Sequence, residues 1–64
     1  MNKRIKRNRI RCKCCGDIIE SRQIYDFQQC SCKTVAVDGG LEYAKRIFPS
    51  NPPEKFYDEL VEYE

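Results

Sequence analysis

Five cysteines are the residues of this sequence whose type and spacing point most directly to chemistry. Thiolates supplied in pairs by two short loops are the usual ligands of a structural zinc ion, which binds four of them tetrahedrally at about 2.3 Å. A first loop needs two residues between its ligands. Cys12 and Cys15 provide this spacing, followed at once by Gly16, and a shorter second loop contains Cys30 and Cys32. The spacing predicts one structural zinc ion per chain, held by Cys12, Cys15, Cys30 and Cys32.

Other uses of the cysteines fit this sequence less well. Cys14 lies between the members of the first pair and is expected to point away from the metal. An odd number of cysteines disfavours a framework of disulfides, and a redox-active CxxC centre would normally lie in a βαβ pattern that is not seen around it. A catalytic zinc site usually has a histidine or carboxylate ligand and an open position, and this chain has no histidine. The cluster is therefore expected to be a closed site that stabilises the fold.

The positive charges are concentrated at the amino-terminal end of the chain. Of the 12 lysines and arginines, seven lie in residues 1–13 without an acidic neighbour, whereas residues 14–64 hold the other five and all 10 acidic residues. Such a segment indicates salt-dependent contact with nucleic acid or another polyanion. It is equally typical of a solvated strand or of an arm that docks on the acidic end of its own chain or of a second copy. The candidate polyanion contacts are Arg4, Lys6, Arg7, Arg9 and Arg11.

The remaining pattern predicts a small, metal-stabilised α+β fold. Residues 1–8 show no apolar face and are expected to form a flexible basic arm. The fourteen residues between Cys15 and Cys30 are expected to form a hairpin that returns the second cysteine pair to the first. With a short helix, this zinc-ribbon domain would extend over residues 9–48. Its short antiparallel strands are expected at residues 9–12, 17–22, 24–29 and 34–38.

Two helices are expected after the strands. In LEYAKRIF, residues 41–48, apolar side chains recur at helical spacing, and Pro49 ends the segment. Asn51, followed by two prolines and a glutamate, is a typical helix start. The segment KFYDELVEYE then spaces its apolar residues four apart, which predicts an amphipathic helix in residues 49–64. Its acidic carboxyl end opposes the helix dipole, so this helix is expected to pack on the domain or on a second subunit.

The segment Asp38-Gly39-Gly40 is the most site-like feature outside the cysteines. Two glycines before a helix would expose backbone N–H groups to a small anionic ligand such as a phosphate. Arg46 could reach that anion, and Tyr43 could stack on a base or ribose. The alternative, which the sequence favours, is a tight turn in which Asp38 caps the helix while Tyr43 and Arg46 pack on the surface.

Several of these motifs occur together in an order that resembles a known group of proteins. The motifs are IxCxxCGDxIES from residue 10, DFxxCSC from residue 26 and VDGGxxYxxR from residue 37. Over residues 9–47 they resemble an uncharacterised family of short zinc-ribbon-like proteins of phages, prophages and their bacterial hosts. The resemblance implies a zinc-ribbon core and a phage or bacterial source, and it implies no activity. That family has glycine where this chain has Lys33, and commonly lysine at the position of Cys14, which supports leaving Cys14 out of the ligand set.

These observations favour a binding protein over an enzyme. The sequence shows no nucleophile paired with a base and no phosphate-binding loop, and a core this small would hardly shelter an active site from water. We expect a non-enzymatic interaction protein, for which the resemblance implies a phage accessory role that modulates a host protein or captures a defence-signalling nucleotide. Seven aromatic residues are many for such a core, so some are expected to face outward or to pack in a homodimer.

The alternative function is that of a nucleic-acid-binding zinc ribbon, such as a transcription accessory factor, which would use the basic arm. No segment of the sequence resembles a base-reading helix, and the acidic body of the chain opposes a broad nucleic-acid surface. Neither a secretory signal nor an apolar run long enough to span a membrane is seen. We therefore expect a protein of the bacterial host cytoplasm with no membrane partner.

Overall fold

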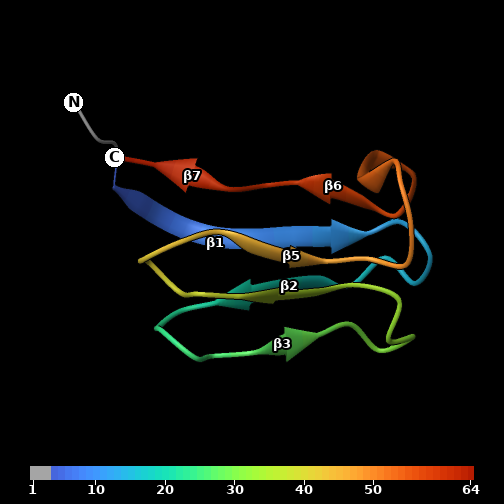
Figure 1. The fold of residues 1–64 in the computed structure, drawn as a ribbon, viewed down its shortest axis with the longest axis horizontal. Helices are drawn as coiled ribbons and strands as arrows, with labels where there is room; N and C mark the ends of the chain where they lie inside the picture. Colours follow the sequence, from blue (N-terminus) through green and yellow to red (C-terminus); the bar gives the residue numbers. More distant parts are fainter. Residues whose placement is uncertain (1–3) are drawn as a thin grey trace.

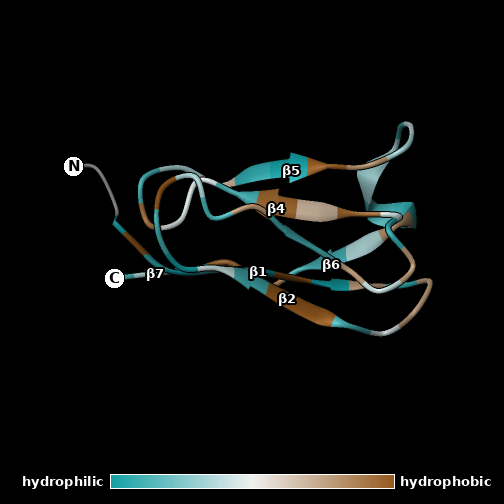
Figure 2. Cartoon of the chain, turned by 90° about the horizontal axis from the view of Figure 1, so that it is seen from below, coloured by the Kyte–Doolittle hydropathy of each residue, from teal (hydrophilic) through white to brown (hydrophobic). Residues whose placement is uncertain are grey.

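Two antiparallel β-sheets packed face to face form the protein in the computed structural model, which describes residues 4–64 (Figures 1 and 2). The first sheet contains β1 (Ile5–Cys12), β2 (Ile18–Ser21), β6 (Tyr57–Glu59) and β7 (Glu62–Tyr63). The second contains β3 (Gln28–Gln29), β4 (Ala36–Asp38) and β5 (Lys45–Ile47). The described residues include no α-helix, and their one helical element is the 3-10 turn η1 (Pro53–Lys55).

β1 is the central strand of the first sheet. It pairs with β2 along one edge and with β6 and β7 along the other, always antiparallel. Its side chains alternate as in a strand with one buried face: Asn8, Ile10 and Cys12 are buried, whereas Arg7 and Arg11 are exposed. The segment IKRNRIRC thus has an arginine-rich outer face, and its buried residues lie on the face toward the second sheet. Figure 2 shows the two sheets as separate layers.

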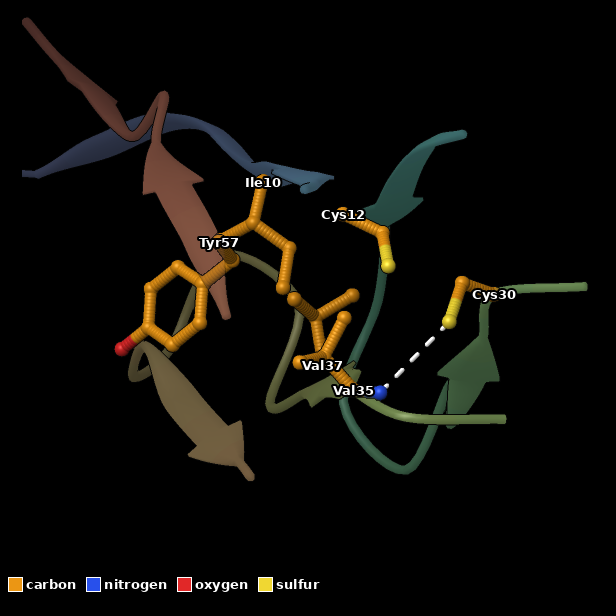
Figure 3. Packing of buried hydrophobic residues seen from close by; sticks show 6 residues of the cluster. All are labelled: Ile10, Cys12, Cys30, Val35, Val37 and Tyr57. Atoms are coloured by element: carbon orange, nitrogen blue, oxygen red, sulfur yellow. Dashed lines mark hydrogen bonds between the residues drawn. The ribbon is translucent and has the colours of Figure 1, made fainter. Parts of the chain in front are cut away.

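The core between the two sheets is small. Its buried cluster consists of Ile10, Cys12, Cys30, Val35, Val37 and Tyr57 (Figure 3). Phe48 packs against this cluster, with its ring centroid 6.1 Å from that of Tyr57 and the two rings tilted by 51°. Because cysteines are members of the cluster itself, the core and the cysteine site are one physical unit.

The helix expected at residues 41–48 is wrong, and with it the expected α+β class. The carbonyl of Gly39 accepts hydrogen bonds from the N–H groups of Glu42 and Tyr43, at 3.0 and 3.3 Å, which makes one turn that does not continue. The chain then pairs with β4 as β5. An isolated helix of this length is only marginally stable, so the backbone pairing with β4 determines the local structure.

The amphipathic helix expected in residues 49–64 is also wrong. After η1 the chain continues as β6 and β7 along β1. The N–H of Lys13 donates to the carbonyl of Phe56 (2.9 Å) and that of Leu60 to the carbonyl of Arg9 (3.2 Å), which continues the pairing beyond β6. Of the acidic residues that would oppose a helix dipole, Asp58 and Glu62 pair with arginines of β1, and Glu59 pairs with Arg46 of β5.

The cysteine loops are not joined by the expected hairpin. β2 pairs with β1 and β3 pairs with β4, so the segment between Cys15 and Cys30 crosses from the first sheet to the second. The strand expected at residues 24–29 is reduced to Gln28–Gln29. The physical reason is a turn, closed by a hydrogen bond from the N–H of Asp26 to the carbonyl of Gln23 (3.0 Å). The two cysteine loops are brought together because the second sheet packs against the first.

Other predicted segments correspond more closely to the structure. The strands expected at residues 17–22 and 34–38 contain β2 and β4. β1 contains the strand expected at residues 9–12 but begins at Ile5. The expected flexible arm of residues 1–8 is therefore part of the sheet from Ile5 onward, and its residues 1–3 lie outside the described part of the chain.

Candidate metal centre

The side chains of Cys12, Cys15, Cys30 and Cys32 converge, with their sulfur atoms all within 4.8 Å of one another. The Sγ atom of Cys32 lies 3.6 Å from that of Cys12 and 3.5 Å from that of Cys30. Four sulfurs that share a tetrahedral zinc ion at about 2.3 Å would lie about 3.8 Å apart. The structure thus brings the predicted ligand set together at a spacing that suits a metal ion, and Cys14 is not part of the set.

The first cysteine loop starts at the end of β1. Buried Cys12 donates its N–H to the carbonyl of Asp17 (2.8 Å) and accepts at its own carbonyl from the N–H of Gly16 (2.9 Å). Gly16 has a φ of +80°, a left-handed conformation that glycine adopts readily. These contacts reverse the chain after Cys12, with Cys14 and Cys15 exposed in the turn.

The second cysteine loop is a tight turn before β4. The N–H of Cys30 donates to the carbonyl of Val35 (3.2 Å), and the N–H of Lys33 donates to the carbonyl of Cys30 (2.9 Å). The N–H of Val35 lies 3.5 Å from the sulfur of Cys30, a contact that orients this side chain (Figure 3). Lys33 has a φ of +61°, so this position, where the resembling family has glycine, requires the left-handed region.

A carboxylate connects the two cysteine loops. The side chain of Asp17 accepts hydrogen bonds from the N–H of Ser31, at 2.8 Å, and from the Ser31 hydroxyl. These bonds hold the pKa of Asp17 below its usual range, since they stabilise the charged form. Asp17 follows the first loop and Ser31 lies inside the second, so the contact fixes their relative position. Sequence reasoning missed this role, because nothing in the spacing pairs these two residues.

The thiols differ in how readily they ionise. Burial raises the pKa of Cys12 to about 12. Hydrogen bonding from the hydroxyl of Thr34, which lies 3.0 Å from the Cys32 sulfur, and from the Thr34 N–H lowers the pKa of Cys32 to about 6. A metal ion binds thiolates. Cys32 therefore ionises more readily than Cys12, whose thiolate would be favoured by the positive charge of a bound metal.

The Asp38-Gly39-Gly40 segment uses its N–H groups within the fold and does not precede a helix. The N–H of Gly39 donates to the carboxylate of Asp38 (2.7 Å), and the N–H of Gly40 donates to the hydroxyl of Ser21 (2.9 Å). A Cβ atom on Gly40 would lie 2.1 Å from the backbone of Gln23. Glycine is therefore required here by the close approach of two loops. Two other parts of the tight-turn alternative are wrong, because β5 follows in place of the helix that Asp38 would cap, and only 8% of the Arg46 side chain is exposed.

The side chain of Asn8 gathers the other residues of that candidate site. Fully buried, it donates to the carbonyls of Asp38, Gly40 and Tyr43 at 3.0, 2.8 and 3.2 Å. Its oxygen accepts from Arg46 at 2.5 Å. The guanidinium of Arg46 also forms two hydrogen bonds with the carboxylate of Glu59, at 2.9 and 2.6 Å. Sequence reasoning missed Asn8, whose signal is a lone asparagine at an inward position of a strand.

Most of the candidate polyanion contacts are paired with acidic residues of neighbouring strands. The ion pairs are Arg7 with Glu20 on β2, Arg9 with Glu62 on β7, and Arg11 with Asp58 on β6. Arg4 and Lys6 are exposed and form no ion pair with any residue that the structure describes. The basic strand thus docks on acidic residues of its own chain, which was the second of the two expectations for this segment.

No helix within residues 4–64 has the length and apolar character needed to cross a membrane. Comparison with curated proteins and with solved structures gives no significant match. A family profile does match, over residues 4–48, which contain both cysteine loops and the Asp38-Gly39-Gly40 segment. Because this match covers more than half of the 64 residues, the chain belongs to the family described as a domain of unknown function, DUF7695.

Proposed function

We propose that this chain is a small zinc-stabilised binding protein, in which the metal ion is structural and the outer surface carries the function. The observation that carries the proposal is the convergence of Cys12, Cys15, Cys30 and Cys32 within 4.8 Å, from loops that belong to two different sheets. A metal held at this point would connect the two sheets next to a small hydrophobic cluster that contains Cys12 and Cys30 themselves.

Zinc is the metal that suits this ligand set best. Four thiolates without histidine or carboxylate are soft ligands, and a tetrahedral sulfur site is typical of structural zinc. With all four positions filled by protein, the ion would have no open site for a substrate. The metal would therefore contribute folding free energy, and the function would lie on the surface that the metal stabilises.

The composition of the surface supports a binding role. Large apolar residues are exposed in several loops and strands, and three of them, Ile24, Tyr25 and Phe27, occur within one loop. The exposed residues are Ile18, Ile24, Tyr25, Phe27, Leu41, Tyr43, Ile47 and Tyr63. Aromatic side chains contribute strongly to protein interfaces, because they bury a large area at a small entropic cost. The partner class we infer is a protein of a bacterial cell, and the phage setting stays a prediction from the resemblance.

The metal is tested by elemental analysis of the purified protein and of serine variants. One zinc per chain is expected in the wild type and in Cys14→Ser, with unchanged circular dichroism. Cys12→Ser, which removes a buried ligand, is expected to lose zinc and β-sheet signal together. Retention of stoichiometric zinc by Cys12→Ser, or its loss in Cys14→Ser, would contradict the ligand assignment.

The binding role is tested by affinity capture with the zinc-loaded protein from bacterial lysate, followed by mass spectrometry of proteins and small molecules. We expect a protein partner that remains bound after nuclease treatment and is recovered again when it is purified and mixed with the chain. Recovery of nucleic acid alone would show that the proposal is wrong, as would conversion of a recovered small molecule by the chain.

A further inference from the structure

We propose that the loop of residues 22–27 is the partner-binding element, and that Tyr25 at its tip inserts into an apolar pocket of another protein. This inference rests on the proposed binding function and specifies its surface and partner. The loop connects β2 to β3 and exposes Ile24, Tyr25 and Phe27, with 46%, 81% and 49% of their surface accessible. Tyr25 is the most exposed of the large apolar residues in the described chain.

Hydrogen bonds hold this loop in one shape. The carbonyl of Asp26 accepts from the hydroxyl of Ser21 (2.6 Å). The carboxylate of Asp26 accepts from the N–H of Arg22 (2.9 Å) and from the side chain of Gln28 (2.6 Å). Each carboxylate oxygen of Asp26 thus accepts a hydrogen bond from within the loop or its flanking strand, which stabilises the turn. A loop that is already ordered loses little entropy on binding, which favours its use as an anchor.

The backbone at the tip is unfavourable for the residue it carries. Tyr25 has a φ of +66°, in the left-handed region that bulky residues rarely adopt. Glycine or asparagine would suit the turn better, and the ring of Tyr25 contributes little to folding at this exposure. Strained positions of this kind persist where the rest of the structure enforces them, and they are typical of binding sites.

The loop lies at the end of the molecule opposite the cysteines. In Figure 1 the connection from β2 to β3 is at one end of the sheets, and the turns that follow β1 and β3 are at the other. Gly40 packs against Gln23 and so supports the loop from the second sheet. A partner could therefore reach Tyr25 without contacting the cysteine cluster, and loss of the metal and loss of the contact can be measured separately.

The surroundings of the loop favour a separate protein as the occupant. Two surface hollows of the described chain are lined mainly by charged residues, so neither of them offers the ring of Tyr25 from a second copy an apolar pocket. Those residues include Arg4, Glu42 and Glu64 in one hollow and Arg7, Glu20 and Arg22 in the other. Binding to a lipid surface relies on clustered basic residues, whereas the loop carries one cation.

Charge complementarity defines the partner further. Arg22 forms no ion pair with the residues that the structure describes, whereas the Asp26 carboxylate is occupied by internal hydrogen bonds. The loop thus presents an exposed guanidinium, near Glu20 and Asp26 but not in an ion pair with them, and a phenol hydroxyl beside apolar surface. Arginine and tyrosine are the residues that most often dominate interface energies. The matching site is an apolar pocket with an acidic rim.

The test places a photo-crosslinking residue, p-benzoylphenylalanine, at three exposed positions and uses the zinc-loaded full chain in bacterial lysate. The variants are Tyr25→p-benzoylphenylalanine, with Ile18 and Ile47 replaced in the same way as matched positions on β2 and β5. We expect one protein to crosslink from position 25 and not from position 47. That protein, once purified, should bind Tyr25→Ser at least roughly tenfold more weakly than wild type, and bind Tyr63→Ser as tightly as wild type.

Each other outcome overturns the inference. A protein that crosslinks from position 18 or 47 but not from 25 would leave the binding function intact and place the interface elsewhere. Crosslinking from position 25 to a second copy, to lipid or to nucleic acid would identify a different occupant. Equal binding of Tyr25→Ser and wild type to the purified partner would show that the ring is not the anchor. A chain that captures no protein from any position would contradict both the inference and the binding function.

Discussion

At the scale of single residues, Asn8 shows how one buried polar side chain organises a segment that the sequence marked as a candidate site. It makes hydrogen bonds with the carbonyls of Asp38, Gly40 and Tyr43 and with the guanidinium of Arg46. A buried amide needs such partners, because an unsatisfied polar group costs about 1–3 kcal/mol. The Asp38-Gly39-Gly40 turn is therefore shaped by a strand residue more than 30 positions earlier in the chain.

Replacing Asn8 should lower the free energy of unfolding substantially. Asn8→Ala leaves three carbonyls and the Arg46 guanidinium without their partner, and we expect a loss of about 3 kcal/mol in the free energy of unfolding. Urea unfolding of the zinc-loaded protein, followed by circular dichroism, measures this loss. Gln29→Ala, at an exposed position of β3, is the control and should change the value by less than about 0.5 kcal/mol. Equal effects of the two variants would contradict the assigned role of Asn8.

The candidate metal site could be predicted from the sequence because its information is local. Each ligand pair lies within one short loop, and the spacing of Cys12 with Cys15 and the glycine that follows are sufficient to choose between the available thiols. Asn8 and Asp17 could not be predicted, since their partners lie far along the chain and are defined by sheet packing. Sequence spacing therefore identifies the candidate ligands, whereas the contacts that position them become visible only in the folded structure.

At the scale of elements, the sequence predicted the strands at residues 9–12, 17–22 and 34–38, whereas both expected helices are wrong. Periodicity alone did not separate helix from strand in residues 41–48 and 55–64, which are short and mix apolar with charged residues. In both segments pairing with a neighbouring strand determines the secondary structure: β5 pairs with β4, and β6 and β7 pair with β1. The acidic residues near the carboxyl end were the useful signal: they match the arginines of β1 better than they suit a helix dipole.

Two glycines offer a matched test of how tightly the loops of the two sheets pack. Gly16 and Gly40 both have positive φ, at +80° and +55°. A Cβ atom on Gly16 meets nothing within 4 Å, whereas one on Gly40 would lie 2.1 Å from backbone atoms of Gln23. We expect Gly16→Ala to cost about 1 kcal/mol from backbone strain alone and Gly40→Ala about 3 kcal/mol or more. Urea unfolding compares them, and a similar cost for both would show that the loop junction is loosely packed.

The ion pairs between β1 and its neighbours give the sheet a predictable pH dependence. Hydrogen bonds from Arg7 hold the pKa of Glu20 below its usual value, and those from Arg11 do the same for Asp58. For a carboxyl whose pKa is lower in the folded state, the added stability is present above the pKa of the unfolded chain, about 4. It is lost as pH falls through the folded value, since protonation removes the charge.

Comparing wild type with Glu20→Gln isolates the pH dependence of the Arg7–Glu20 ion pair. Release of the metal by acid would affect wild type and variant alike. We expect the urea midpoint of wild type to exceed that of Glu20→Gln at pH 7, and the difference to shrink between about pH 5 and pH 3. Glu42→Gln, at an exposed position, should follow wild type over the whole range. A difference between wild type and Glu20→Gln that stays constant with pH would show that the ion pair contributes nothing to the sheet.

At the scale of the whole molecule, the cysteine cluster connects two sheets that share no strand. Cys12 ends the central strand of the first sheet, and Cys30 and Cys32 lie in the turn between β3 and β4 of the second. The hydrophobic cluster between the sheets contains Cys12 and Cys30 themselves. A chain of 64 residues buries only about 60% of the surface that its unfolded form exposes, so a hydrophobic core of this size is marginally stable. The metal site is therefore expected to determine the stability of both sheets, not that of its own loops alone.

Removal of the metal with a chelator should unfold both sheets together. Zinc binding at a site of this kind provides on the order of 10 kcal/mol of folding free energy, more than so small a core can replace. Hydrogen exchange followed by NMR should show that the amides of Ile10 in β1 and Val37 in β4 lose protection in parallel as zinc is removed. Added zinc should restore both, in wild type and in Cys14→Ser alike. Persistent protection of Val37 in the metal-free protein would mean that the second sheet folds without the metal, and that the cluster stabilises only its own loops.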